Sequence, residues 1–238
     1  MTQIAPGAYS MKQNKGGHVH AFLLDNGTDL TLIDTLFDTD ARRVLDRIKS
    51  IDRAVTDLKR IVLTHAHRSH LGGLATLKGL SGATVYSHEW EADIIAGERP
   101  AQPPVTIFPM RPLRTYWRVY YLQFGAALGR GKHPPCPVDR LVKDGDTIGP
   151  VRVLHTPGHT PGHLAFWWPE RRVLFAGDAI ATYPVFEAGW PAFNLNPTRQ
   201  RTSISRMARL EAEVVAIGHG DPITAGAAER LHSLAEER

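Results

Sequence analysis

Three histidines lie within six consecutive positions, at His65, His67 and His70, directly after a short apolar run. Neutral imidazole is the commonest protein ligand for zinc-like ions. In an extended segment His65 and His67 point to the same side, and a helix expected over 71–78 returns His70 toward them. This spacing favours a metal site over three unrelated solvated or core histidines.

Ligand-type residues also end three later strand-like runs, at His159, Asp178 and His219. Residues at strand ends converge on one edge of a sheet, which is where α/β folds build their sites. Each of these motifs is common by itself. Their order along the chain, together with the histidine cluster, predicts one shared site.

The chain resembles the metallo-β-lactamase superfamily. The first metal-binding motif of that family reads His-x-His-x-Asp-His, usually followed by x-Gly-Gly. Residues 65–73 match it at every defined position except Ser69, where the family has aspartate. The later motifs match around His159 in Thr-Pro-Gly-His-Thr-Pro-Gly-His, at Asp178 in Gly-Asp, and around His219 in Gly-His-Gly.

The resemblance runs from about residue 18 to the C-terminus and implies an α/β (α+β) fold. This fold is a four-layer αβ/βα sandwich, with two mixed sheets between outer helices and the metals at one sheet edge. The residue pattern agrees, because strands and helices alternate in two similar halves, and Asn26-Gly27 between apolar runs predicts a hairpin. Strands are expected at 20–24, 30–34, 60–64 and 83–87 and near Val151, Leu164, Val173 and Val214, and helices at 39–50, 88–96, 197–210 and 225–236.

The same resemblance implies a metal-ligand set of five histidines and one aspartate. These are His65, His67 and His159 for a first ion, His70 and His219 for a second, and Asp178 as the bridge between the two. Asp34 is expected to brace the metal loop, and His163 to support its own loop; neither is expected to bind metal.

Ser69 stands where the family has the remaining aspartate ligand of the second ion. A serine hydroxyl is a neutral and poor ligand, and loss of even a supporting partner costs about 10–100-fold in metal affinity. The expected cofactor is therefore zinc, as one or two ions with a weak second site, and iron or manganese is an alternative. Three interpretations stay open: a slow one-metal hydrolase, a hydrolase with a substitute acid or base, or a chain whose aspartate was deliberately replaced.

The chemistry follows from the ions. Bound zinc lowers the pKa of its water to about 7, which makes a hydroxide available to attack an acyl centre. The predicted activity is hydrolysis of an ester, lactone or thioester of a small, partly apolar and optionally anionic substrate. Asp178 and Ser69 are the expected catalytic positions, and Tyr183 is a third candidate, with a packed surface tyrosine as its alternative. β-Lactam hydrolysis is the alternative activity, and a metal-poor protein that binds an anionic ligand is the alternative of another class.

The segment 99–138 is expected to be an insertion over the metals, within one domain spanning 1–238. It contains no Asp or Glu but six Arg or Lys residues, Arg130 among them. Pro112 suits the start of a helix, and its apolar side chains recur at three- and four-residue spacing. This face either packs on the body or lines a pocket where an arginine pairs with a substrate carboxylate. The expected substrate contacts are Trp117, Arg118, Tyr121, Phe186 and Trp190, and the expected apolar face is Leu113, Trp117, Tyr120, Tyr121, Phe124 and Leu128.

Composition sets limits on the class of protein. A hydrophobic content of 42% is ordinary for a globular chain, no apolar run is long enough for a membrane span, and residues 1–15 lack a signal-peptide pattern. Cys136 alone excludes an intrachain disulfide. We therefore expect a cytoplasmic protein with a small-molecule substrate. The net charge of +4 leaves nucleic acid as a disfavoured partner, and the oligomeric state stays open, with a homodimer as one option.

Overall fold

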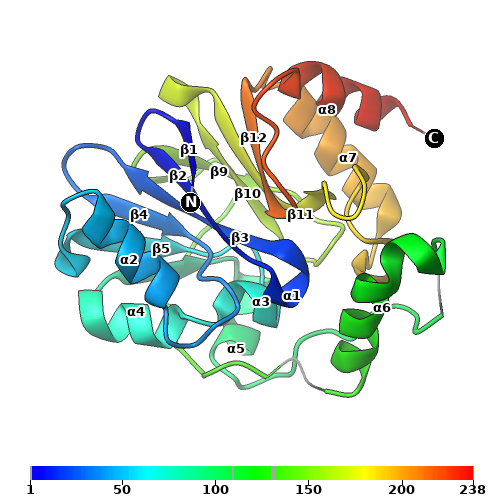
Figure 1. Ribbon diagram of the computed structural model, residues 1–238, viewed down its shortest axis with the longest axis horizontal. Helices are drawn as coiled ribbons and strands as arrows, with labels where there is room; N and C mark the ends of the chain where they lie inside the picture. The colour runs from blue at the N-terminus through cyan, green and yellow to red at the C-terminus, as the bar shows by residue number, and fades with distance from the viewer. Residues whose placement is uncertain (1, 109, 130–131, 238) are drawn as a thin grey trace.

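The computed structural model describes residues 2–108, 110–129 and 132–237 (Figure 1), so Arg130 lies outside the described residues. The strands are β1 (Thr2–Ala5), β2 (Ala8–Gln13), β3 (Val19–Asp25), β4 (Leu30–Ile33), β5 (Leu58–Val62), β6 (Thr84–Ser87), β7 (Arg140–Leu141), β8 (Thr147–Ile148), β9 (Val151–His155), β10 (Leu164–Trp168), β11 (Val173–Ala181) and β12 (Val214–His219). The helices are α1 (Lys15–His18), α2 (Arg42–Ser50), α3 (Arg68–Leu71), α4 (Leu74–Ser81), α5 (Glu89–Ile95), α6 (Leu113–Ala127), α7 (Pro197–Ala208) and α8 (Ala227–Glu236), with 3₁₀ turns at Val55–Asp57, Pro169–Arg171 and Pro191–Phe193.

The strands pair in the order β7-β6-β5-β4-β3-β12-β11-β10-β9-β8, and β2 adds to β3 while β1 adds to β2. The join between the two halves is short, because β3 and β12 share the single residue pair Val19–His219. The two mixed sheets expected from the sequence are therefore continuous through one seam, and that seam lies at a predicted metal ligand.

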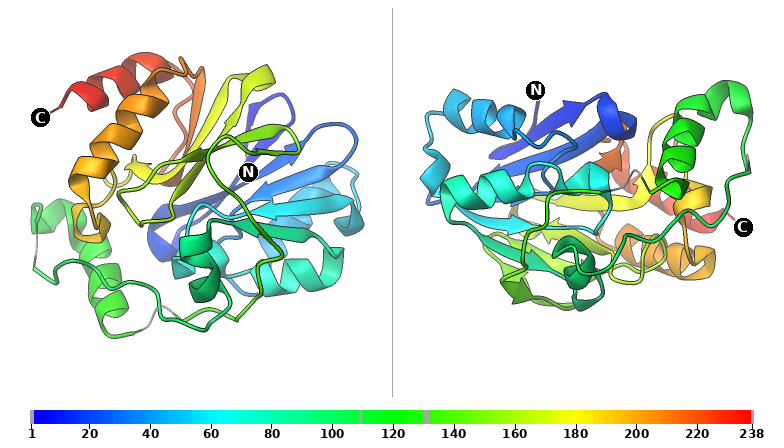
Figure 2. Two further views of the ribbon diagram at one scale, coloured as in Figure 1. Left: turned by 180° about the vertical axis from the view of Figure 1, so that it is seen from behind. Right: turned by 90° about the horizontal axis from the view of Figure 1, so that it is seen from below.

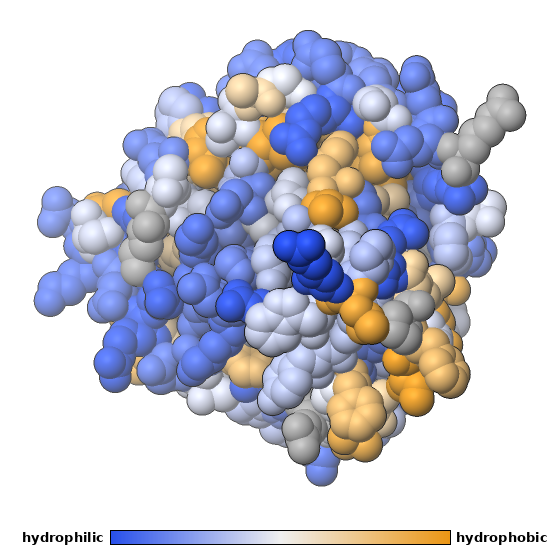
Figure 3. Space-filling model, turned by 45° about the vertical axis from the view of Figure 1, so that its right-hand side comes forward, coloured by the Kyte–Doolittle hydropathy of each residue, from blue (hydrophilic) through white to orange (hydrophobic). Residues whose placement is uncertain are grey.

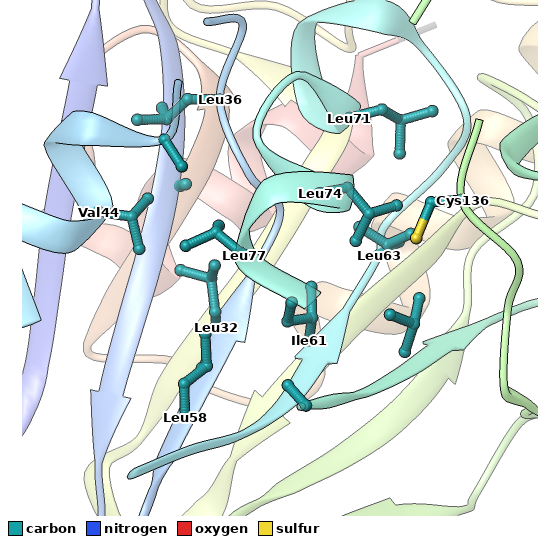
Figure 4. Close-up of a cluster of buried hydrophobic side chains, with 14 of the residues drawn as sticks. Leu32, Leu36, Val44, Leu58, Ile61, Leu63, Leu71, Leu74, Leu77 and Cys136 are labelled. Carbon is teal, nitrogen blue, oxygen red and sulfur yellow. The ribbon is translucent and has the colours of Figure 1, made fainter. Parts of the chain in front are cut away.

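Three apolar clusters show that the curled sheet and its helices form the four predicted layers. One cluster lies between the two halves of the sheet and includes Phe22, Ile33, Phe166 and Phe175. A second packs α2 and α4 onto β4 and β5 (Figure 4). The third packs α7 and α8 onto β11 and β12. Figure 2 shows these two helix pairs on opposite sides of the sheet halves.

The loop beneath the first histidine motif depends on close backbone packing. The helix expected over 71–78 is divided at Gly72 and Gly73, which separate α3 from α4. The Gly72 amide donates to the Leu36 carbonyl at 2.8 Å, and a Cβ at Gly72 would lie only 2.1 Å from the Phe37 carbonyl oxygen. Only glycine fits here, so this residue lets the histidine motif press against the loop after β4.

Helix α6 begins directly after Pro112, as predicted, but most of its predicted apolar face does not pack on the body. The residues that pack on the body are Tyr116, Val119 and Gln123. The large apolar side chains that remain exposed are Leu113, Trp117, Tyr121, Phe124 and Leu128, and Figure 3 shows apolar residues gathered on this side of the molecule. The reason is that polar bonds select the buried face: the Tyr116 hydroxyl donates to Glu187 and the Gln123 amide donates to the Thr106 carbonyl.

None of the helices in the described part of the chain is both long and apolar enough to cross a bilayer.

Candidate metal centre

The six predicted ligands meet at one end of the sheet. They lie where strands end or bend: His65 and His67 in the loop after β5, His70 in α3, His159 in the loop after β9, Asp178 within β11 and His219 at the end of β12. Five of the six are buried, and His67 is half-buried. The strand-end argument from the sequence therefore predicts their convergence, although the residues come from both halves of the chain.

The first group of donors is a triangle of ring nitrogens beside a carboxylate. His67 Nδ1 lies 3.0 Å from His65 Nε2 and 3.1 Å from His159 Nε2, and Asp178 Oδ2 lies 3.6 Å from both Nε2 atoms. Ligands around a tetrahedral ion with bonds of about 2 Å have similar separations. These residues can therefore hold a divalent metal ion without a large rearrangement.

The second group shares the same carboxylate. Asp178 Oδ1 lies 3.4 Å from His70 Nε2, and Asp178 Oδ2 lies 3.1 Å from His219 Nε2. His70 Nε2 and Asp178 Oδ1 are buried and make no hydrogen bond within the described residues. Burial opposes the ionisation of Asp178, but His219 and His70 outweigh it and hold the pKa of this carboxyl well below its usual range. Buried polar atoms without partners, aimed at one point, fit a second cation position.

Four of the five ligand rings are oriented through their Nδ1 atoms, which leaves Nε2 free for the metal. The Nδ1 partners are Thr64 Oγ1 for His65 at 3.0 Å, Asp34 Oδ2 for His70 at 2.9 Å, Asn194 Oδ1 for His159 at 3.1 Å and the Gly17 carbonyl for His219 at 2.9 Å. The partners belong to four separate segments of the chain, so the ring positions depend on the fold as a whole.

The electrostatic surroundings of these histidines favour a bound cation. Burial lowers the pKa of His65 and His67 well below the usual value, so their rings are neutral and offer a lone pair. Burial also disfavours the charged form of His70, but the carboxylates of Asp178 and Asp34 outweigh it and raise its pKa to about 10. The position between these two carboxylates therefore attracts positive charge.

Asp34 and His163 lie behind the ligands. Asp34 accepts hydrogen bonds from the Thr64 amide at 2.9 Å and the Thr64 hydroxyl at 2.8 Å, in addition to its contact with His70. His163 Nε2 accepts from the Asp178 amide at 3.0 Å, and its Nδ1 lies 2.8 Å from Thr156 Oγ1. Both residues therefore fix the backbone or ring of a ligand from outside the ligand set.

Glu91 is a supporting residue that the sequence analysis missed. Its carboxylate is 2% exposed, and it accepts hydrogen bonds from the Ala66 amide at 3.0 Å, the Gly162 amide at 3.0 Å and the Thr160 hydroxyl at 2.6 Å. It thereby joins the loop of His65 to the loop of His159. An available signal was that Glu91 occupies the inward stripe of α5 together with Ile94 and Ile95.

A pocket of about 860 Å³ opens onto the ligands. Ser69 lines it and is half-buried. The apolar part of the lining comes from several elements: Phe37, Ile94, Ala101, Tyr121, Leu122, Ala126, Pro135, Trp190 and Phe193. Trp190 stacks on His219 with ring centroids 4.2 Å apart. At Gly17, which has a φ of +83°, a Cβ would lie 2.3 Å from this indole, so glycine is required for the stacking.

The structure brings only part of the predicted substrate set to the pocket. Tyr121 and Trp190 line it, whereas Trp117, Arg118 and Phe186 are not among the lining residues that the structure describes. Arg118 lies over the Trp117 ring at 5.1 Å, and Arg230 covers Phe186 at 4.4 Å. Tyr183 also lies outside the lining, where its ring stacks on His18 at 4.1 Å.

Comparison with known proteins agrees with this geometry. A model of the metallo-β-lactamase superfamily matches residues 14–219. Among curated proteins, the hydroxyacylglutathione hydrolase GloC of Haemophilus influenzae is 26% identical over 198 residues, which cover 80% of this chain and 81% of GloC.

Two solved structures are similar throughout the fold. The metallo-β-lactamase family protein TTHA1429 from Thermus thermophilus has a TM-score of 0.67 and 29% identity, covering 97% of this chain and 78% of that one. TTHA1623 in a di-iron-bound form has a TM-score of 0.65 and 26% identity, covering 94% and 98%.

Proposed function

Because this chain belongs to the metallo-β-lactamase superfamily, it is a metallohydrolase, and we propose that it cleaves an ester, lactone or thioester of a small, partly apolar acyl compound. The observation that carries this proposal is the convergence of five histidines and Asp178, of which His67, His159, His219 and Asp178 line one pocket. The similarity to GloC, a hydroxyacylglutathione hydrolase, supports an acyl thioester as one substrate of this class.

We assign the first metal ion to His65, His67 and His159, and a second to His70 and His219, with Asp178 between them. The nitrogen and carboxylate donors suit zinc and iron, and the di-iron form of TTHA1623 supports iron as an alternative to zinc. When bound, such an ion supplies a Lewis acid and lowers the pKa of a water molecule. Because Ser69 is neutral, we expect the second site to be the weaker one.

The protein's own residues supply orientation and an environment with little water. Trp190 and Phe193 pack against His219 and His67, at 4.2 and 5.9 Å between ring centroids. They exclude water from one side of the ligands and offer an apolar surface to an acyl chain. The Asp178 carboxylate is the one acidic group among these ligands. Because its pKa lies well below the usual range, it stays ionised and offers negative charge to a bound cation.

The test measures metal content and hydrolysis together. Protein purified without added metal and protein reconstituted with zinc are assayed on four probes: a hydroxyacylglutathione thioester, 4-nitrophenyl acetate, a γ-lactone and nitrocefin. We expect hydrolysis of at least one of the first three, and we expect it to rise with metal content.

Two variants define the controls. His159→Ala removes a proposed ligand and should reduce both metal content and hydrolysis. His232→Ala removes an exposed histidine that pairs with Glu211 and should change neither. If zinc-loaded protein hydrolyses none of the first three probes, the proposal fails; hydrolysis of nitrocefin alone would replace it with β-lactam cleavage.

A further inference from the structure

Arg68 directly follows His67 and lines the same pocket as His67 and Ser69. Its Nη1 donates to the Phe37 carbonyl, and its guanidinium carbon lies 4.3 Å from the centroid of the Phe37 ring. These two contacts hold the planar group at the pocket wall. Its Nε and Nη2 atoms make no hydrogen bond within the described residues. The edge of the guanidinium that carries these two nitrogens is therefore available to a ligand.

No described carboxylate neutralises Arg68. Asp38 is the acidic residue whose charge acts on Arg68, but the two form no ion pair. The Asp38 oxygens already accept from Gln13 at 3.0 Å and Lys15 at 3.2 Å. A half-buried guanidinium without a counter-charge gains from any anion that reaches it.

Three other arginines of the described chain, all in the segment 99–138, already have partners. Arg99 contacts Asp93 through Nε at 2.7 Å and Nη2 at 2.9 Å. Arg111 contacts Glu187 at 3.2 Å, and Arg118 lies over an indole outside the pocket. These observations therefore favour Arg68, from the metal loop itself, over Arg99, Arg111 and Arg118 as the arginine that meets a substrate carboxylate.

The charge of the pocket points the same way. Its described lining contains only two acidic residues, Glu98 and Asp178, and Asp178 already faces the ligand histidines. Ser69 adds no negative charge beside Arg68. The region between the ligands and Arg68 therefore favours an anionic group, and bound metal would strengthen that preference.

We propose that the pocket takes acyl substrates that carry a carboxylate, and that Arg68 binds this carboxylate through Nε and Nη2. The apolar part of the substrate then lies on Phe37 and Trp190, and the scissile carbonyl faces the ligand histidines. This inference rests on the proposed hydrolase function, and it deepens that function by specifying the charge of the substrate.

The experiment compares a neutral ester with an anionic one, 4-nitrophenyl acetate with mono-4-nitrophenyl glutarate, on zinc-loaded protein. Arg68→Gln should raise KM for the glutarate ester by about tenfold or more, as expected for loss of a charge-assisted hydrogen bond. kcat/KM for the acetate ester should change much less, so the ratio of the two kcat/KM values should change by about tenfold. Arg68→Lys retains the positive charge but not the paired N–H donors of the guanidinium, so it should recover part of the affinity for the glutarate ester. An equal effect of Arg68→Gln on both esters would overturn the proposal.

Arg99→Gln is the matched control, because Arg99 lines the same pocket but already pairs with Asp93; it should not change the ratio of the two KM values. Titration calorimetry with glutarate gives a readout that does not require hydrolysis. If neither ester is cleaved but glutarate binding depends on Arg68, the anion site stands and the proposed hydrolase function fails. If the acetate ester is cleaved and glutarate binding is the same in wild type and Arg68→Gln, the function stands and the anion site fails.

Discussion

The metal ligands and helix α6 form two walls of one pocket, but they are held in different ways. The ligand loops are buried, and hydrogen bonds such as that from His159 to Asn194 fix their rings. Helix α6 is joined to the body by the Tyr116–Glu187 bond and a small apolar cluster around Trp190. It leaves Trp117 60% exposed and Tyr121 70% exposed.

The difference separates two tasks. Metal binding needs donors held within a few tenths of an ångström, which buried, cross-linked loops provide. A substrate wall tolerates local motion, because apolar contact is not directional. Substitutions in the ligand wall should therefore change metal content, whereas substitutions in α6 should change local stability and leave metal content unaffected.

Asp178→Asn should have the largest effect. The substitution keeps the size of the side chain but removes the only carboxylate shared by the two donor groups. We expect metal affinity and hydrolysis to fall by at least about 100-fold, measured by elemental analysis and by steady-state rates. Asp221→Asn, at a carboxylate that is 77% exposed, should change neither. Full metal content in Asp178→Asn would contradict the assignment.

Glu91→Ala should weaken both the fold and the metal centre. It leaves the buried Ala66 and Gly162 amides without acceptors. We therefore expect the free energy of unfolding to fall by about 2–4 kcal/mol and Tm to fall by about 4–16 °C. The weaker link between two ligand loops should also lower metal affinity by about 10–100-fold.

Glu91→Gln and Glu89→Ala refine that measurement. The glutamine oxygen can still accept from Thr160 and Gly162, but its amide group would face the Ala66 N–H. The decrease in the free energy of unfolding should therefore be smaller than in Glu91→Ala. Glu89 is exposed on the same helix, and its removal should stay within about 0.5 kcal/mol. Equal losses in Glu89→Ala and Glu91→Ala would show that the helix, rather than the carboxylate, matters.

Ser69→Asp should strengthen the ligand wall instead. A carboxylate beside His70 and His219 adds a charged donor to the second group, and we expect its metal affinity to rise by about 10–100-fold. Zinc titration followed by elemental analysis checks this. Unchanged occupancy would mean that another group already completes the second site.

Tyr116→Phe tests the other wall. It removes the hydroxyl that donates to the buried Glu187 at 2.7 Å. This should lower the free energy of unfolding by about 1–2 kcal/mol and increase hydrogen exchange in α6. Metal content should stay unchanged. A parallel loss of metal would show that the two walls are coupled.

Trp117→Gln should have the smallest effect. The indole is largely exposed and contacts Arg118, so we expect a change in stability within about 0.5 kcal/mol and no change in metal content. Urea denaturation checks this. A loss above about 2 kcal/mol would mean that a partner covers this face in solution.

How far the sequence predicts the structure depends on whether a residue's role is local. Strand-end motifs locate His65, His159 and His219 because each follows a recognisable strand. Glu91 and Arg68 act through contacts with distant loops. The inward stripe of α5 marks Glu91 as buried, but no local pattern shows which loops these two residues contact. For α6, the helix and its start at Pro112 were predictable from local propensity. Its buried face was not, because that face is selected by Glu187, far away in the sequence.

The seam between β3 and β12 has a consequence for how the chain reaches its folded state. His219 contacts the Gly17 carbonyl across 202 positions of sequence, and Val19–His219 is the single residue pair that joins these strands. Closing a loop of this length costs conformational entropy, so we expect these contacts to form after the local ones. Because the ligands come from both halves of the chain, a bound metal ion would join the halves and should slow their separation.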